Sequence, residues 1–406
     1  MSRTPKRSSR RSIHKGAIAP GAHIGQPERR RDWTGASPAE ILARHPPGRF
    51  KPLEVLEVVI KLFNSNHTAL DKKVSHKTKH DRAAFLRRFF RDLQAKAGFR
   101  TLPDPRNLGY RHVQAMVQVW QQERLAPATI QTYLSFLRGL ALWLGKPGLV
   151  HGPEHYGLVP AEYQRHEAAE RDRSWSGHGI DVDALIERIA AHDRYVGAQL
   201  AVMRALGLRR KEAVMLRPRA CTVPFEALGL PESERAADFY VRIKAGAKGG
   251  RMRLIPLDSP MRLSAMARAE AMAEHADAHL GNPALDLKQN LRRFNHMLAR
   301  FGLTWRERGA TGHGLRHEAA HDAFQAMTGA PAPIRGGGPL APDVELTARL
   351  HVAELAGHAR IRASCAYLGP VGRRKQRHAQ VAPCFSPRLG ATATEHSDPG
   401  PDDHPG

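Results

Sequence analysis

The 406-residue sequence has only three cysteines, Cys221, Cys365 and Cys384, and they lie far apart without forming a C-x-x-C pair. This excludes a disulfide scaffold and a zinc site built from paired thiolates, and it is typical of a protein from a reducing compartment. Aromatic residues make up only 6% of the chain. A binder of single-stranded nucleic acid that relies on stacking platforms is therefore disfavoured.

Long apolar runs are also missing, so we expect no segment that spans a bilayer. The first seven residues, MSRTPKR, are polar and basic and lack the apolar core of a signal peptide. We therefore expect a soluble protein of the cytoplasm.

Acidic residues are scarce relative to basic ones. The chain has 63 Lys and Arg against 39 Asp and Glu, for a formal net charge of +24. A surplus of this size creates a long-range positive potential that suits a polyanion, of which DNA and RNA are the commonest. A basic surface that is merely solvated is the alternative explanation.

Composition and periodicity divide the chain into five parts. Residues 1–50 read as a basic, disordered arm, which either tracks phosphates or has no specific role. Residues 51–146 are predicted to form a small helical domain, 147–178 a linker and 179–369 a second domain. Residues 370–406 are polar and rich in proline, and we expect them to be disordered.

The first of the two domains should be a four-helix unit with one small core. Four apolar stripes at helical spacing predict its helices; they begin near Leu53, Phe85, Val113 and Ile130. Basic residues on the polar faces of these helices are able to line DNA as a set.

The second domain should be mainly helical with a β-hairpin. We expect helices near 181–192, 195–206, 260–280, 287–301, 315–327, 344–356 and 360–368. Residues 238–243 and 252–255 have the pattern of two short strands, joined by the Gly- and Lys-rich turn at 245–250. Residues 329–342, with three consecutive glycines, should form a loop.

Two motifs place cations at turns. In Gly207-Leu208-Arg209, a helix ends and Arg209 opens the next one, with Glu212 three residues later to hold its guanidinium. Lys248 stands at the predicted hairpin turn, from which it can reach a DNA backbone and donate a proton to a leaving oxygen. Taken alone, the first motif is an ordinary ion pair at a helix start and the second is a charged turn.

Two further motifs combine histidine, arginine and tyrosine. His313 and Arg316 are three residues apart, so one helix face presents both, either to a phosphate or simply to solvent. A Leu-Ala-Gly-His step ends at His358, and Tyr367 follows nine residues later. On its own, this last pair would be a helix cap and a packed ring.

The four motifs together, in this order, resemble the tyrosine recombinases, the family of phage integrases and Xer-type resolvases. The matching patterns are G-L-R-x-x-E, K-G-x-x-x-R-x-x-P-L, H-x-L-R-H, and L-x-G-H followed by tyrosine. The resemblance covers residues 180–368, and the preceding helical segment resembles the family's core-binding (SAM-like) DNA-binding domain more loosely.

The resemblance implies a role for each residue. Arg209 and Arg316 would clamp the phosphate, Lys248 would be the general acid, and His313 the general base or proton relay. His358 would hydrogen-bond the phosphate, and Tyr367 would attack it to give a 3′-phosphotyrosyl intermediate without metal, ATP or another cofactor. Glu212 and His317 match supporting positions around the catalytic set.

A rival interpretation uses overlapping residues. His317-Glu318-Ala319-Ala320-His321 spells H-E-x-x-H, the pattern of zinc metalloproteases, in which two histidines on one helix face bind zinc. This interpretation leaves Arg209, Lys248 and Tyr367 unexplained. Two further rivals are a DNA-binding protein that has lost catalysis and a type IB topoisomerase.

Two features depart from the family pattern. The segment between Arg316 and His358 is longer than usual, mostly within 329–342, and the pocket survives only if this insertion leaves the helix before His358 in place. After Tyr367, Pro370, Pro383 and Pro387 predict against a long C-terminal helix. Coupling between protomers through such a helix should therefore be weak or built differently.

We thus predict a mainly α fold with a small antiparallel hairpin, arranged as a two-domain, C-shaped clamp. The expected partners are double-stranded DNA, three further copies of the chain in a tetramer on two DNA sites, and accessory DNA-bending or directionality factors. The basic arm and the insertion favour a mobile-element integrase over a multimer resolvase. Such an enzyme would act in the cytoplasm, at the nucleoid of a bacterium.

Overall fold

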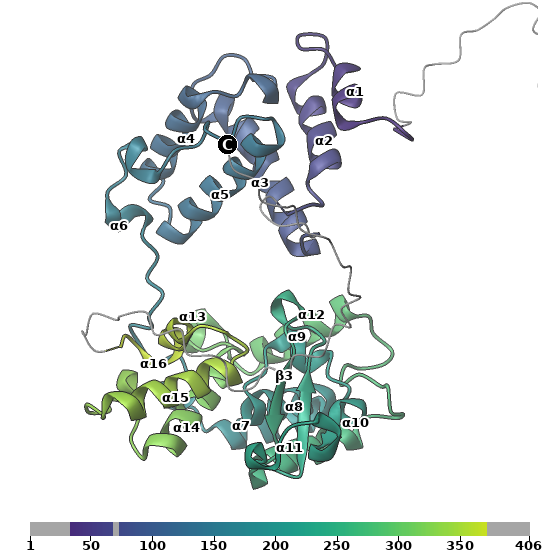
Figure 1. The fold of residues 1–406 in the computed structure, drawn as a ribbon, viewed down its shortest axis with the longest axis vertical. Coiled ribbons are helices and arrows are strands. Elements are labelled where there is room, and N and C mark those ends of the chain that lie inside the picture. Colours follow the sequence, from purple (N-terminus) through teal and green to yellow (C-terminus); the bar gives the residue numbers. More distant parts are fainter. Residues whose placement is uncertain (1–32, 68–72, 372–406) are drawn as a thin grey trace, which may run out of the picture. The chain divides into compact units, whose positions relative to one another are not determined.

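The computed structural model describes residues 33–67 and 73–371, and its contacts divide the chain into two compact units, residues 1–165 and 166–406 (Figure 1). Each unit has its own hydrophobic core. The units are described separately below, and the clamp remains a prediction. No helix in the described part of the chain is long and apolar enough to cross a membrane.

In its described part, the first unit consists of helices joined by loops, with one isolated β-bridge between Asn66 and Lys73. Its helices are α1 (Pro38–Ala43), α2 (Pro52–Phe63), α3 (His76–Ala95), α4 (Tyr110–Gln122), α5 (Pro127–Trp143) and α6 (Pro160–Tyr163). Proline stands in the first turn of α1, α2, α5 and α6, where its missing N–H costs nothing. The four predicted apolar stripes coincide with α2, α3, α4 and α5.

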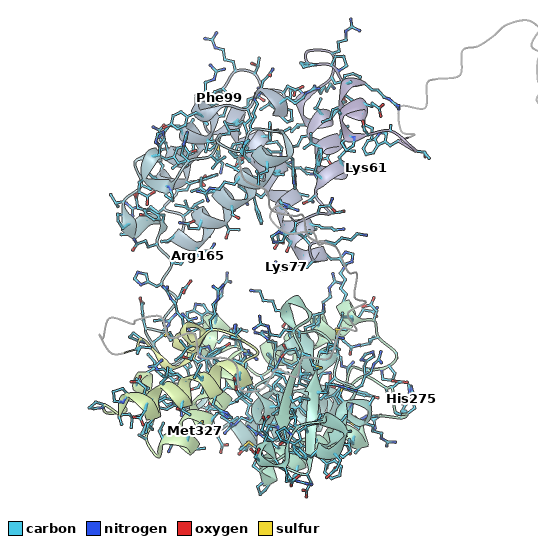
Figure 2. The ribbon with its side chains drawn as sticks, viewed as in Figure 1. Lys61, Lys77, Phe99, Arg165, His275 and Met327 are labelled. Atoms are coloured by element: carbon cyan, nitrogen blue, oxygen red, sulfur yellow. The ribbon has the colours of Figure 1, made fainter. Side chains whose placement is uncertain are left out.

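Burial of these stripes forms the core of the first unit. Phe85, Leu86 and Phe89 of α3 are at most 4% exposed and pack in one cluster with Val117 of α4 and Leu134 of α5. The opposite face of α3 carries charged side chains such as Lys77, whose side chain is 83% exposed (Figure 2). The helix is therefore amphipathic in the sense that its sequence pattern predicts.

Two of the predicted boundaries differ from the structure. Within the expected arm, Ser37 and Glu40 form a reciprocal capping box that starts α1, and Ile41 of this helix is buried. Within the expected linker, Val150 and Tyr156 are buried in the core of the first unit. Short apolar anchors thus extend the folded unit in both directions. Residues 1–32 of the arm lie outside the described part.

The second unit consists of ten helices and one small sheet in its described part. The helices are α7 (Val182–His192), α8 (Arg194–Leu206), α9 (Arg210–Val214), α10 (Pro218–Cys221), α11 (Pro260–Ala271), α12 (Leu287–Arg300), α13 (Trp305–Arg308), α14 (Gly314–Thr328), α15 (Pro342–Leu355) and α16 (Cys365–Leu368). Helix α8 is buried along most of its length and contacts α7, α11 and α14. The functional elements are arranged around this central helix.

The sheet has the strand order β1-β2-β3, all antiparallel. Strands β2 (Phe239–Ile243) and β3 (Arg253–Pro256) are the predicted hairpin, with Val241 opposite Ile255. Strand β1 (Thr222–Pro224) was not predicted, because three residues ending in proline carry no alternating pattern. Helix α11 ends at Ala271, earlier than expected, and the backbone N–H of Leu280 donates to the carbonyl of Leu216, at 2.8 Å.

The insertion does not displace the helix before His358. Residues 329–342 leave α14 at Gly329, form one turn of 3-10 helix at Pro333–Arg335, and lead into α15, which packs along α14. Ala332 of this segment is 1% exposed, so the insertion is partly built into the core. Of the predicted tail, residues 372–406 lie outside the described part.

Candidate active site

Tyr367 lies on the short helix α16 with its ring 5% exposed. Its hydroxyl oxygen accepts a hydrogen bond from Nε of Arg316, at 2.9 Å. The two residues are 51 positions apart in sequence. The proposed nucleophile and one proposed phosphate clamp are thus in direct contact.

Arg316 is 1% exposed and is held by the ends of two helices. Its Nη1 donates to the carbonyl of Gly207, at 2.5 Å, and its Nη2 donates to the carbonyl of Ala356. Gly207 caps α8 in the left-handed region (φ 60°), and Ala356 caps α15. Carbonyls at helix C-termini lack helical partners and carry partial negative charge, so they satisfy a buried guanidinium.

Arg209 begins α9, as the sequence predicts, and its guanidinium bonds to one of the carbonyls that also hold Arg316. Nη1 donates to Oε1 of Glu212, at 2.8 Å, and Nη2 donates to the carbonyl of Ala356, at 3.1 Å. The other oxygen of Glu212 accepts from the backbone N–H of Arg209, at 2.8 Å. Arg209 and Arg316 therefore share one carbonyl acceptor.

Glu212 is 1% exposed and balances the cations around it. Arg253 of β3 donates to both of its oxygens, at 3.2 and 2.8 Å. Burial by itself would raise the pKa of Glu212, but the bonds from Arg253 and Arg209 outweigh it and lower the pKa to about 2. The carboxylate therefore stays ionised and fixes both arginines.

His358 follows the turn that ends α15. Gly357 adopts a left-handed conformation (φ 64°), which brings Nε2 of His358 to 3.3 Å from Nη2 of Arg209. Burial, and then the cations of Arg209, Arg316 and Lys248, lower the pKa of His358 to about 4. The imidazole is neutral at neutral pH.

His313 caps the N-terminus of α14 beside Tyr367, with 6.3 Å between the ring centroids. Part of its surface faces solvent, yet the surrounding protein and the cations of Arg316, Arg209 and Arg173 lower its pKa to about 4. Among the described contacts, the Tyr367 hydroxyl has Arg316 as its hydrogen-bond partner, and His313 is not bonded to it. The ring of His317 is nearer to that of Tyr367, at 5.0 Å.

Lys248, like the His313 side chain, lies outside this hydrogen-bonded cluster. It lies exposed on the turn between β2 and β3. Its charge contributes to the low pKa of His358, which places it within electrostatic range of the pocket. A side chain on such a turn is free to approach a bound phosphate.

The H-E-x-x-H residues on α14 have other partners. Both oxygens of Glu318 accept hydrogen bonds from Ser176, and Nε2 of His321 bonds to the carbonyl of Tyr367, at 2.9 Å. In the part of the chain that the structure describes, no three His, Cys, Asp or Glu side chains form a group able to hold a metal ion. Of the two histidines that the zinc interpretation requires, His321 is thus bonded to the Tyr367 helix, and the ring of His317 packs against that of Tyr367.

Acidification should destabilise this unit through His317. This ring is 3% exposed, and burial, followed by the nearby histidines and Arg173, lowers its pKa to about 3. Between this value and about 6.5, the unfolded chain binds more protons, so stability falls as the pH falls. We expect the loss at pH 5 to be about 2 kcal/mol from His317 alone.

Thermal unfolding of the full chain at pH 7 and pH 5 measures this effect. The drop in Tm between the two pH values should be smaller in His317→Gln than in the parent. His275→Gln, which changes an exposed histidine of the same unit, serves as the matched control and should leave the drop unchanged (Figure 2). Equal drops in His317→Gln and the parent would contradict the assignment.

Sequence reasoning missed the partners that hold the site together. Arg253 is part of the K-G-x-x-x-R-x-x-P-L motif, but its pairing with Glu212, 41 residues away, has no signal beyond that motif. Arg335 lies in the segment that the sequence predicts as a loop. For Arg335, 159 or more residues separate it from its partners Asp172, Ser174 and Ser176, and the sequence gives no signal for such a pairing.

Two family models match the chain. The model described as "Phage integrase, N-terminal" matches residues 42–150, and the model described as "Integrase" matches residues 175–322. The second match includes the motifs around Arg209, Lys248 and Arg316 and ends before His358 and Tyr367. A search of curated proteins finds no match.

Solved structures with a similar course of the chain include a lambda integrase dimer bound to a core site, with 14% identity, TM-score 0.47, and coverage of 81% of this chain and 99% of that one. A lambda integrase tetramer bound to a Holliday junction has 14% identity, TM-score 0.48, and coverage of 84% and 83%. The XerH recombinase in a post-cleavage complex has 14% identity, TM-score 0.44, and coverage of 80% and 82%.

The assignment to a family rests on the two family models and on four motifs in one order, three of which lie within the second match. The chain is a member of the tyrosine recombinase family, to which the integrases belong, and it is a site-specific recombinase.

Proposed function

We propose that this recombinase integrates or excises a mobile element, using Tyr367 to cut and rejoin double-stranded DNA. The observation that carries the proposal is the bond between the Tyr367 hydroxyl and Nε of the buried Arg316. A cation at this position stabilises the phenolate that must form during attack. The ordinary pKa of tyrosine is about 10, so at neutral pH the nucleophile needs such help.

The chemistry proceeds in two balanced steps. The Tyr367 oxygen attacks the scissile phosphorus as its proton passes to His313, and the bond to the 5′ oxygen breaks as that oxygen takes a proton from Lys248. A 3′-phosphotyrosyl link results, and the 5′ hydroxyl of another strand later reverses the reaction. The bond energy is kept in the tyrosyl link, which is why neither metal nor ATP is needed.

The other side chains of the site would bind the phosphate and stabilise the negative charge that develops on it. Arg209 and Arg316 face developing negative charge with N–H groups that are already oriented by Glu212, Gly207 and Ala356. His358 would add a hydrogen bond to the same phosphate. Because the pKa of His313 is about 4, this ring is neutral at pH 7 and able to accept a proton.

The first unit would contact the DNA in addition to the second unit. Helix α3 exposes Arg88 and Arg91, and Arg88 stacks on Tyr133 of α5, with its Cζ 5.1 Å from the ring centroid. Such cations contact phosphates and position the protein without reading bases. We further propose a tetramer on two DNA sites, acting in the cytoplasm at the nucleoid with accessory DNA-bending factors.

Trapping on nicked duplex DNA tests the proposal. We expect a covalent adduct that survives denaturation when the purified chain is incubated with a nicked fragment library made from the DNA that surrounds its gene. The adduct should form equally in excess chelator, because no step uses a metal ion. Sequencing the DNA end that remains on Tyr367 identifies the site.

The outcome separates the competing functions. Trapped ends at the boundaries of one genetic element support the integrase, whereas trapped ends at a single site of a chromosome or plasmid indicate a multimer resolvase. A metalloenzyme of the H-E-x-x-H type would form no covalent adduct, and its activity would be lost on chelation and return with zinc. No adduct on any fragment would contradict the recombination proposal.

A further inference from the structure

The chain enters the second unit through residues 169–176, called here the entry segment, and this segment is attached to the active site at two places. The backbone N–H of Ala169 donates to the carbonyl of Cys365 on the Tyr367 helix, at 2.8 Å. Trp175, which is fully buried, donates from Nε1 to the carbonyl of Thr311, at 2.8 Å, just before His313. The segment thus touches both α16 and the start of α14.

Close packing fixes the second of these attachments. A Cβ atom on Gly314 would lie 2.7 Å from the carbonyl oxygen of Arg173 and 2.6 Å from the ring of Trp175. Only glycine leaves room for the entry segment to cross here. The N-terminus of α14, which presents His313 and Arg316, is therefore positioned by the entry segment.

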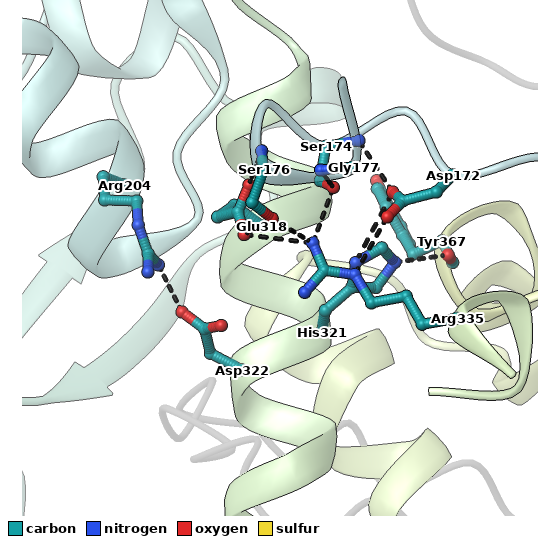
Figure 3. Close-up of polar contacts among 10 residues, drawn as sticks. All are labelled: Asp172, Ser174, Ser176, Gly177, Arg204, Glu318, His321, Asp322, Arg335 and Tyr367. Carbon is teal, nitrogen blue, oxygen red and sulfur yellow. Dashed lines mark hydrogen bonds and ion pairs between the residues drawn. The ribbon is translucent and has the colours of Figure 1, made fainter. Parts of the chain in front are cut away.

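Arg335 from the insertion fastens the entry segment to α14 (Figure 3). Its Nε donates to Asp172, at 2.9 Å, and its Nη2 donates to the hydroxyl oxygens of Ser174 and Ser176, at 2.6 and 2.5 Å. The same Nη2 lies 3.1 Å from Oε1 of Glu318 on α14. One guanidinium thus joins three residues of the entry segment to α14.

His321 of α14 lies between this network and the nucleophile. Its Nε2 bonds to the backbone carbonyl of Tyr367, at 2.9 Å, whereas its Nδ1 lies 3.7 Å from Oδ1 of Asp172 and has no hydrogen-bond partner among the described residues (Figure 3). Helix α16 is only four residues long, so this carbonyl has no partner within the helix. His321 is 1% exposed and supplies that partner from α14.

The carboxylates of the network are ionised, whereas burial lowers the pKa of His321. Burial would raise the pKa of Asp172 and of Glu318, but hydrogen bonds from Ser174 and from Ser176, together with Arg335, lower both. Both groups are thus anionic at neutral pH, and Arg335 neutralises them. Without Arg335, two carboxylates would face each other across the entry segment with no cation of this network between them.

We propose that Arg335 is a positioning residue for Tyr367, acting through the entry segment that it holds against α14 and that bonds to the Tyr367 helix at Ala169, and that this is what the insertion contributes to the reaction. It holds the entry segment, α14 and α16 in one arrangement, in which the Tyr367 hydroxyl meets Nε of Arg316. Arg335 touches neither the hydroxyl nor the phosphate site. The inference rests on the proposed function, since it concerns the rate at which Tyr367 attacks DNA.

Single-turnover cleavage of the trapped site by Arg335→Met tests the proposal. We expect the rate at saturating DNA to fall by at least about tenfold, which corresponds to about 1.4 kcal/mol. The DNA concentration that gives half the maximal rate should stay within about twofold, because no DNA contact is removed. A merely structural residue would lower the amount of active protein, not the rate of each active molecule.

Arg204→Met is the matched control. Arg204 of α8 forms an ion pair with Asp322, one turn beyond Glu318 on the same helix, and this pair has no link to the entry segment (Figure 3). Its cleavage rate should stay within about threefold of the parent. Arg335→Lys should recover part of the rate, since lysine retains the charge but not the fork of donors.

A second variant covers the case in which Arg335→Met fails to fold. Asp172→Asn retains the volume and removes one charge from the network, and we expect a cleavage rate lowered by about threefold or more. Parental rates in both Arg335→Met and Asp172→Asn would overturn the positioning role, and so would equal losses in Arg204→Met. If Tyr367→Phe still formed the adduct, the proposed function would fail instead.

Discussion

Replacing Tyr367 by phenylalanine will abolish covalent attachment to DNA while leaving DNA affinity within about twofold of the parent. The change removes one oxygen atom, which is the proposed nucleophile. Its one described partner is Nε of Arg316, at 2.9 Å, and the ring keeps its packing against the histidines of α14. Adduct formation on the nicked substrate and a binding titration measure the two effects separately.

Tyr195→Phe is the matched control for this experiment. Tyr195 of α8 is also a buried tyrosine of the second unit, 8% exposed, and its hydroxyl accepts a bond from the neighbouring Arg194, at 3.5 Å. This variant should form the adduct at the parental rate. An adduct that persists in Tyr367→Phe would place the nucleophile elsewhere and remove the basis for the assigned roles.

Replacing Arg316 by alanine should cost several kcal/mol of transition-state stabilisation, or a rate loss of about 10²-fold to 10³-fold. Arg316 is the cation in contact with the nucleophile, and its guanidinium is held in place before the phosphate arrives. Single-turnover cleavage at saturating DNA measures the loss. A rate within about tenfold of the parent would contradict the clamp role.

Alanine at this position also leaves the carbonyls of Gly207 and Ala356 without their donor, which can destabilise the unit. Arg316→Lys keeps a charge and should still lose most of the rate, because one ammonium group cannot reproduce the planar fork. Arg82→Lys in the first unit is the control, since Arg82 is 4% exposed and likewise bonds to a backbone carbonyl. It should cleave at nearly the parental rate once bound to DNA.

Local patterns in the sequence were sufficient for most of the elements. The four apolar stripes of the first unit, the turn at Gly207, the start of α9 at Arg209 and the β2–β3 hairpin all depend on residues within a few positions of one another. The predictions failed for short pieces of the chain. Helix α1 begins at a capping box, a local signal that the prediction did not use, whereas strand β1 and the apolar residues at 150–158 have a weak local pattern and pack against other elements.

The sequence by itself determined which residue types are available for phosphoryl transfer and in which order they occur, because motifs and helix periods are local properties of the chain. Only the tertiary structure decided how these residues are held. The shared carbonyl of Ala356, the pairing of Arg253 with Glu212, and the attachment of the entry segment by Arg335 join positions 40 to 163 residues apart. Packing of whole helices sets such distances, and no pattern within a single helix encodes them.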